Sequence, residues 1–104
     1  MHMHFPVLAS ILAAHVAMSA AIAAEPNISG QRLAATCANC HGTNGISAGG
    51  AIPSLAGISK DTLASSMKAF KTGTRQATIM HQIARGYTDE QIESIAGYLA
   101  AQKK

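Results

Sequence analysis

The chain has 104 residues, of which 48% are hydrophobic and 12% charged, with a formal net charge of +3 and no tryptophan. This length has room for one domain, which excludes a multidomain enzyme within these residues. The modest net charge does not indicate a nucleic-acid partner.

The first 24 residues have the pattern of an export signal. From Phe5 to Ala24 no side chain is charged, and eight of these twenty residues are alanine. Small residues at 21–24 then form a suitable cleavage site. The start has no Lys or Arg, and the stretch is long enough to span a bilayer, so an uncleaved anchor is the alternative. The sequence predicts a cleaved signal peptide at 1–24 and a mature domain at 25–104, located in the periplasm without stable membrane insertion.

The mature domain begins with a predicted helix that leads into the only two cysteines of the chain. Ser29 is expected to cap this helix. Cys37, Cys40 and His41 then follow with the Cys-x-x-Cys-His spacing by which c-type haem is attached. Each thiol would add across one vinyl group of the porphyrin to form a thioether, and the adjacent imidazole is placed to bind the iron.

Two other uses of the cysteine pair stay open. A thiol-disulfide catalyst of the thioredoxin type needs a βαβ setting, and the sequence does not supply the strands. Zinc needs two more Cys or His ligands at a similar spacing. In the mature domain only His81, 40 residues after His41, could join the motif to complete such a site. Haem attachment is the favoured interpretation.

A glycine-rich loop and a second helix are predicted next. Residues 42–57 are uncharged and include five glycines, which indicates a loop that can approach a flat ring closely. Ser59 is expected to cap the following helix, and Gly73 to end it. Its apolar residues recur at i, i+4 and i+7, namely Leu63, Met67 and Phe70.

A short helix and a final helix complete the expected fold. The short helix is predicted from Thr78 to Arg85, and Thr88 with Gln91 forms a capping box for the last one. The buried stripe of the last helix is predicted to be Ile92, Ile95, Ala96 and Leu99. The sequence therefore predicts an all-α fold with three main helices, a short one and no strand.

Met80 is the candidate for the second axial position of the iron. It lies 39 residues after His41, where the chain must return to the opposite side of the ring. Met67 is in register with the apolar side of its helix and is interpreted as core. His81 would point about 100° away from Met80 and is interpreted as a surface residue. A filled sixth position is typical of electron transfer, whereas an open one is typical of ligand binding.

The mature domain resembles the class I cytochromes c over essentially its whole length. The motifs that carry this resemblance are residues 37–42, 53–57, 80, 87–92 and 98–99. It implies the class I cytochrome c fold around one covalently bound haem c, with the last helix crossing the first. It also implies that the carbonyl of Pro53 accepts a hydrogen bond from the haem histidine, and that Leu55 packs on the ring.

Residues 67–73, 77–80 and 83–87 are similar to the cytochrome subunit of flavocytochrome c sulfide dehydrogenase. In that family a separate flavoprotein oxidises sulfide at FAD and passes electrons singly to the haem of a small periplasmic partner. The resemblance implies an FAD-containing sulfide dehydrogenase flavoprotein as partner. This chain lacks the length and fingerprint for binding FAD, so it is expected to transfer electrons without being the catalyst.

Two other functions stay open. Free-standing small cytochromes share the general pattern, so a diffusible carrier that exchanges electrons with other redox proteins is the alternative, and a thiol-disulfide oxidoreductase is the remote one. Basic side chains are candidates for docking at the haem edge, although the lysines among them also fit an ordinary solvated helix face. They are Lys60, Lys68, Lys71, Arg75 and Arg85.

Overall fold

The computed structural model describes residues 25–104, so the predicted signal peptide lies outside the described residues. Every regular element within 25–104 is helical, which confirms the predicted all-α class. In chain order the helices are α1 (Ile28–Ala34), α2 (Ala38–His41), α3 (Lys60–Thr72), α4 (Met80–Arg85) and α5 (Asp89–Ala100). One 3₁₀ turn, Ala35–Cys37, joins α1 to α2, and a second, Thr43–Gly45, follows α2. No helix in this part of the chain combines the length and apolarity needed to cross a bilayer.

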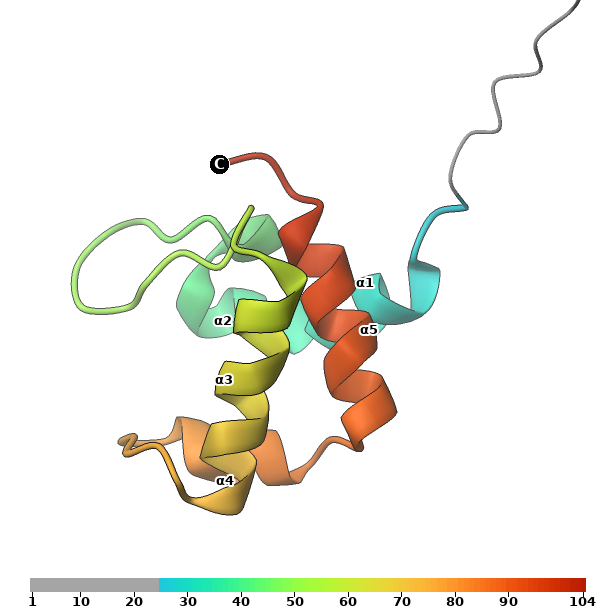
Figure 1. Cartoon of the computed structure of the whole chain (residues 1–104). Coiled ribbons are helices and arrows are strands. Elements are labelled where there is room, and N and C mark those ends of the chain that lie inside the picture. Colours follow the sequence, from blue (N-terminus) through green and yellow to red (C-terminus); the bar gives the residue numbers. More distant parts are fainter. Residues whose placement is uncertain (1–24) are drawn as a thin grey trace, which may run out of the picture.

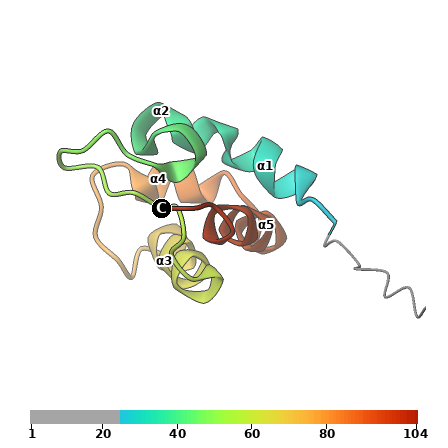
Figure 2. The same cartoon turned by 90° about the horizontal axis from the view of Figure 1, so that it is seen from above.

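Helix α5 is the centre of the packing. It contacts both α1 and α3, while α4 packs against α3 (Figure 1). Two loops leave this helical group. In both Figure 1 and Figure 2, the loop after α2 and the loop between α3 and α4 project to the same side of the molecule. Figure 1 places them at opposite ends of α3.

The contact between α1 and α5 depends on an asparagine and a glycine. The Asn27 Oδ1 atom accepts a hydrogen bond from the Gly30 backbone N–H at 2.8 Å, and Asn27 Nδ2 donates to the Ser94 carbonyl at 2.8 Å. Gly30 is buried, and a Cβ atom there would overlap the Ser94 carbonyl oxygen. Asn27 is therefore the cap of α1. The prediction of Ser29 as cap was wrong, because the helix already begins at Ile28.

The ends of α3 and α5 follow the sequence signals. The Ser59 hydroxyl oxygen accepts a hydrogen bond from the Thr62 N–H at 3.2 Å, and Gly73 ends α3 in the left-handed region with φ of 81°. The Thr88 hydroxyl oxygen accepts from the Gln91 N–H at 3.1 Å, and Gln91 Oε1 accepts from the Thr88 N–H at 2.9 Å. The predicted cap of α3 and the predicted capping box of α5 are confirmed.

The core is small and consists largely of α5 side chains. The predicted stripe is confirmed, since its four residues are at most 3% exposed: Ile92, Ile95, Ala96 and Leu99. Leu63 and Ala64 of α3 and Ala34 of α1 complete this cluster, and Met67 packs against it as expected. Among the described residues, Ile92 is the large side chain that is fully buried. The interior of the protein alone therefore buries little apolar volume.

Candidate haem site

The two cysteines lie where α1 turns into α2. Cys37 is half-buried and Cys40 is exposed, and neither is in a disulfide within the described part of the chain. Burial raises the pKa of the Cys37 thiol, which keeps it protonated at neutral pH. Dithiol catalysts need the opposite, a cysteine whose pKa is lowered. This electrostatic setting argues against the thiol-disulfide alternative.

The zinc alternative depends on His81 joining the motif. Within residues 25–104, no group of three or more His, Cys, Asp or Glu side chains is arranged to hold a metal ion. His81 therefore does not complete a site with Cys37 and Cys40.

The imidazole of His41 is oriented by the loop that follows it. Its Nδ1 atom lies 2.7 Å from the Pro53 carbonyl oxygen. A carbonyl oxygen can only accept, so Nδ1 must carry the proton and donate it. The lone pair is then on Nε2, where an axial metal ligand needs it. This contact is the hydrogen bond that the family resemblance implies.

Serine side chains form hydrogen bonds that fix the residues directly before and after Pro53. The Ser47 hydroxyl donates to the Ile52 carbonyl at 2.7 Å, and the Ser54 hydroxyl oxygen accepts from the Ser47 N–H at 2.9 Å. The sequence predicts this stretch only as a loop and assigns no role to Ser47. A serine-rich, glycine-rich stretch does signal turns built by side-chain hydrogen bonds, but not which carbonyl they reach.

Leu55 follows directly in the same loop. It is half-buried and packs against the core cluster. Its backbone N–H donates to the Gly45 carbonyl at 2.7 Å. Gly45 is buried with φ of 76°, a conformation that favours glycine. The packing of Leu55 on a haem ring stays a prediction.

Met80 is the first residue of α4 and is half-buried. The helix begins two residues later than the predicted start at Thr78, because Ile79 has extended rather than helical φ. The loop that leads into Met80 and the loop that carries Pro53 lie on one side of the molecule, at opposite ends of α3 (Figures 1 and 2).

His81 is not the surface residue that was expected. Its side chain is half-buried, and its Nδ1 atom is buried without a hydrogen-bond partner in the described residues. The expectation considered only the angle between His81 and Met80, whereas α4 also packs against α3.

Exposed isoleucines surround the candidate ligands in the sequence. They are between 38% and 54% exposed: Ile46 and Ile52 in the loop after His41, and Ile79 and Ile83 on either side of Met80. Where such side chains lie together at a surface, they mark a site for an apolar partner. Together with two thiols, an imidazole and a thioether, they fit a flat, apolar, iron-containing ring. The residues present are therefore suited to haem c.

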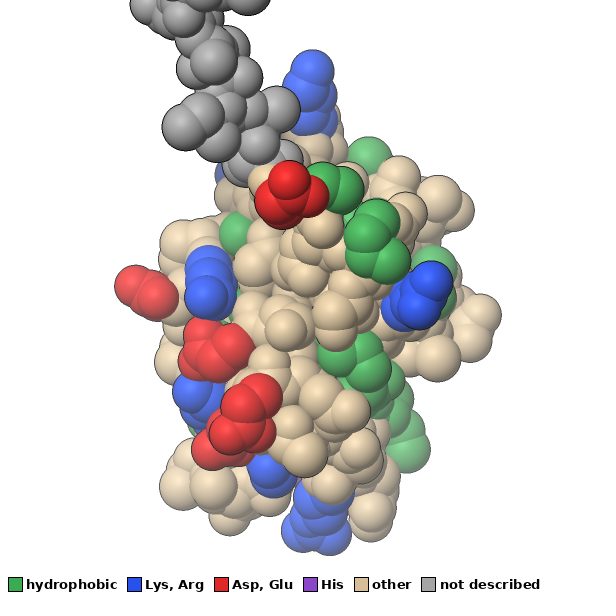
Figure 3. All heavy atoms as spheres, turned by 90° about the vertical axis from the view of Figure 1, so that its right-hand side faces the viewer, with side chains coloured by type: hydrophobic (Ala, Val, Ile, Leu, Met, Phe, Trp, Pro, Cys, Tyr) green, Lys and Arg blue, Asp and Glu red, His purple; other side chains and the backbone are tan. Residues whose placement is uncertain are grey.

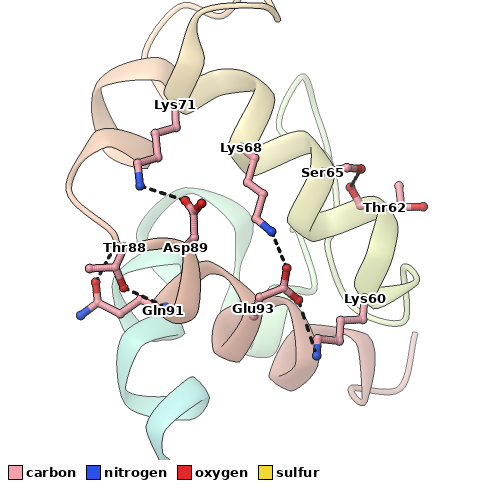
Figure 4. A network of polar contacts seen from close by, with 9 residues as sticks. All are labelled: Lys60, Thr62, Ser65, Lys68, Lys71, Thr88, Asp89, Gln91 and Glu93. Carbon is pink, nitrogen blue, oxygen red and sulfur yellow. Dashed lines mark hydrogen bonds and ion pairs between the residues drawn. The ribbon is translucent and has the colours of Figure 1, made fainter.

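The lysines of α3 are partnered inside the domain. Glu93 of α5 pairs with both Lys60 at 3.6 Å and Lys68 at 2.6 Å, and Asp89 pairs with Lys71 at 3.0 Å (Figure 4). Figure 3 shows acidic and basic side chains alternating along one edge of the molecule. The hydrogen bond from Lys68 lowers the pKa of Glu93, and the one from Lys71 lowers the pKa of Asp89. These lysines therefore form ion pairs within the domain, and their use in docking stays a prediction.

The two arginines proposed for docking differ from each other. The Arg75 guanidinium lies over the Phe70 ring, 4.6 Å from its centroid, and donates to the Ser66 hydroxyl at 2.9 Å. Arg85 is exposed in the last turn of α4, the helix that begins with Met80. Arg85 is thus the docking candidate that best keeps an accessible charge near the site.

Comparison with known proteins extends the likeness over most of the chain. A family model described as cytochrome c matches residues 28–103. The cytochrome subunit of sulfide dehydrogenase from Chlorobaculum tepidum is 44% identical over 69 residues, which are 66% of this chain and 62% of that relative. The chain therefore spans less than two thirds of that relative.

Two further relatives differ in their described roles. Cytochrome c-554(548) from Halomonas halodenitrificans is 39% identical over 77 residues, 71% of this chain and 93% of the relative. The thiosulfate dehydrogenase electron acceptor from Stutzerimonas stutzeri is 36% identical over 67 residues, 62% of this chain and 31% of the relative. The matches thus include a small protein of similar length as well as segments of longer chains.

Proposed function

The chain belongs to the cytochrome c family and is an electron carrier with one covalent haem c. We propose that its Cys-x-x-Cys-His motif and Met80 hold that haem. The cofactor supplies an iron that gains or loses one electron. The observation that carries the proposal is the 2.7 Å hydrogen bond between His41 Nδ1 and the Pro53 carbonyl, because it aims a free Nε2 lone pair away from the backbone.

The side chains have distinct roles in this assignment. The thiols of Cys37 and Cys40 each form a carbon–sulfur bond to a vinyl carbon, while the thiol hydrogen goes to the neighbouring vinyl carbon. His41, oriented by Pro53, would bind the iron. The thioether of Met80 would be its second protein ligand, and such ligation would favour the reduced state and raise the potential. Leu55 would pack against the ring.

We infer that the electron donor is the FAD-containing flavoprotein subunit of a sulfide dehydrogenase. The 44% identity to a cytochrome subunit of sulfide dehydrogenase supports this partner. Sulfide oxidation would then reside in the other polypeptide, and this chain would only accept and pass on electrons. In the same proposal residues 1–24 are removed on export, and residues 25–104 act in the periplasm.

A free-standing diffusible carrier is the second candidate. It is favoured by the relative from Halomonas halodenitrificans, because 93% of that protein is matched by this single domain. A carrier of this kind would meet several redox proteins in turn and form no permanent complex.

One purification separates these functions. The tagged protein is isolated gently from its native periplasm, its visible spectrum is recorded, and every co-purifying chain is weighed. Haem bands with flavin absorption and a stoichiometric larger chain support the subunit function. Haem bands on a lone small protein support the diffusible carrier, and a colourless protein overturns the haem assignment. N-terminal sequencing of the same sample tests cleavage near Ala24.

A further inference from the structure

Two hydroxyl groups far apart in the sequence meet beside the candidate site. The hydroxyls of Thr36 and Tyr87 are hydrogen-bonded at 3.0 Å across 51 residues. Thr36 directly precedes Cys37 in the turn that leads into α2. Tyr87 follows the end of α4, and Met80 is the first residue of that helix. The bond thus joins the segment that attaches the haem to the segment that carries the proposed sixth ligand.

In the described residues, no other hydrogen bond links these two segments. Within 25–104 the bond between Thr36 and Tyr87 is the only hydrogen bond between residues 28–57 and residues 73–88. The start of α4 is less well held, since no side chain there caps the helix and Ile79 is 54% exposed. A helix of six residues is about 9 Å long and moves as one body, so a tether at its C-terminal end restrains Met80 at the other.

We propose that the hydrogen bond between Thr36 and Tyr87 holds α4 against the attachment turn and thereby keeps the Met80 sulfur on the iron. Tyr87 is a positioning residue in this scheme, because it acts through α4. The inference rests on the proposed role of Met80 as axial ligand. Without the tether, α4 spends more time where Met80 is off the iron, and an added ligand binds more readily.

The test is a titration of the ferric holoprotein with imidazole, which must displace Met80 to bind. Loss of the weak red absorption band typical of methionine-ligated ferric haem reports the exchange. Tyr87→Phe keeps the ring that packs against the core and removes only the hydroxyl. It is expected to tighten apparent imidazole binding about fivefold, the effect of one ordinary hydrogen bond. Thr36→Val is expected to do the same, and the double variant no more than either.

Tyr98→Phe is the matched control. The Tyr98 hydroxyl also makes one side-chain hydrogen bond, to Asn44 Oδ1 at 2.8 Å, but it joins α5 to the loop and leaves α4 untouched. Imidazole affinity should equal that of the parent. Unchanged affinity in Tyr87→Phe, or an equal change in Tyr98→Phe, overturns the inference while the parent spectrum still supports Met80. A parent without the red band, and indistinguishable from Met80→Ala, overturns the ligand assignment together with the inference.

Discussion

Asn27 shows how one side chain can serve two elements. Its amide oxygen caps α1 and its amide nitrogen reaches the Ser94 carbonyl in α5. Ser29, the residue with an equally good capping side chain, is exposed inside the helix. The local sequence allows either residue as cap, and the contact with α5, 67 residues away, favours Asn27.

Replacing Asn27 by alanine is therefore expected to lower the free energy of unfolding by about 1–2 kcal/mol, through loss of the cap and the link to α5. Ser29→Ala is the control and should stay within about 0.5 kcal/mol of the parent. Urea denaturation of the holoprotein, followed by far-UV circular dichroism, measures both. Equal losses in the two variants would contradict the assignment of the cap.

For other polar residues too, a role could be predicted from the sequence only where the partner lies close by in the chain. The attachment motif and the capping box could be predicted because their partners lie within a few residues. The hydrogen bonds of Ser47 to the backbone beside Pro53, and of Thr36 to Tyr87, could not be predicted in this way. Their geometry depends on how a glycine loop folds or on which helices meet, and no residue spacing encodes that.

At the scale of elements, two helical glycines lie near the contact between α1 and α5, and their surroundings differ. A Cβ atom on Gly30 would overlap the Ser94 carbonyl oxygen, whereas one on Gly97 would lie 3.6 Å from Asn27 Nδ2, an ordinary contact. Both glycines lie within helices, so alanine would gain intrinsic helix propensity at either position.

Gly30→Ala is accordingly expected to destabilise the protein by about 1–3 kcal/mol, because backbone must shift to relieve the overlap. Gly97→Ala should be neutral or stabilise by up to about 1 kcal/mol. Thermal unfolding of the two holoproteins under the same conditions tests this contrast. A destabilised Gly97 variant beside an unaffected Gly30 variant would mean that the helices cross elsewhere.

The contact between α3 and α5 is made partly by charge. Glu93 accepts from Lys68 and lies near Lys60, and the hydrogen bond from Lys68 is the main reason for its lowered pKa. A group with a lowered pKa in the folded state stabilises the protein above its unfolded pKa. This stabilisation is lost as the pH falls through the lower, folded-state value. The ion pairs of Glu93 should therefore stabilise the fold at neutral pH and lose this effect in acid.

Glu93→Gln is expected to lower the melting temperature at neutral pH and low salt by a small amount, since the pair is exposed to solvent. The difference from the parent should shrink in high salt, and it should disappear in acid once the pH has fallen through the lowered folded-state pKa of Glu93. Glu90→Gln is the matched control, because this exposed residue of α5 makes no ion pair within residues 25–104. A difference that persists in acid would mean that Glu93 acts through packing.

At the scale of the whole molecule, the all-α class and the order of the main helices could be predicted, but the size of the protein core could not. Periodicity identified the buried side of α5, and composition identified the loop. Only the structure shows that five of the nine buried hydrophobic residues are alanines, at positions 34, 56, 64, 84 and 96. Four isoleucines near the candidate ligands stay exposed. The apolar volume that a domain of this size needs is thus divided between protein and cofactor.

This division predicts that haem attachment and folding depend on each other. Cys40→Ala removes one of the two thioether bonds, so it should yield a haem-poor protein after periplasmic expression. Because the protein core alone is small, the same variant should also have lost much of its helical signal. The haem-to-protein ratio and the far-UV spectrum measure the two effects.

Asn39→Ala is the control, since this exposed residue lies inside the motif without a thiol or an imidazole. It should retain both the haem and the helical spectrum. A Cys40→Ala protein with little haem but the full helical spectrum of the parent would show that α1, α3 and α5 fold on their own contacts. The core of Ile92 and its neighbours would then be sufficient, and the cofactor would be bound by a domain that is already folded.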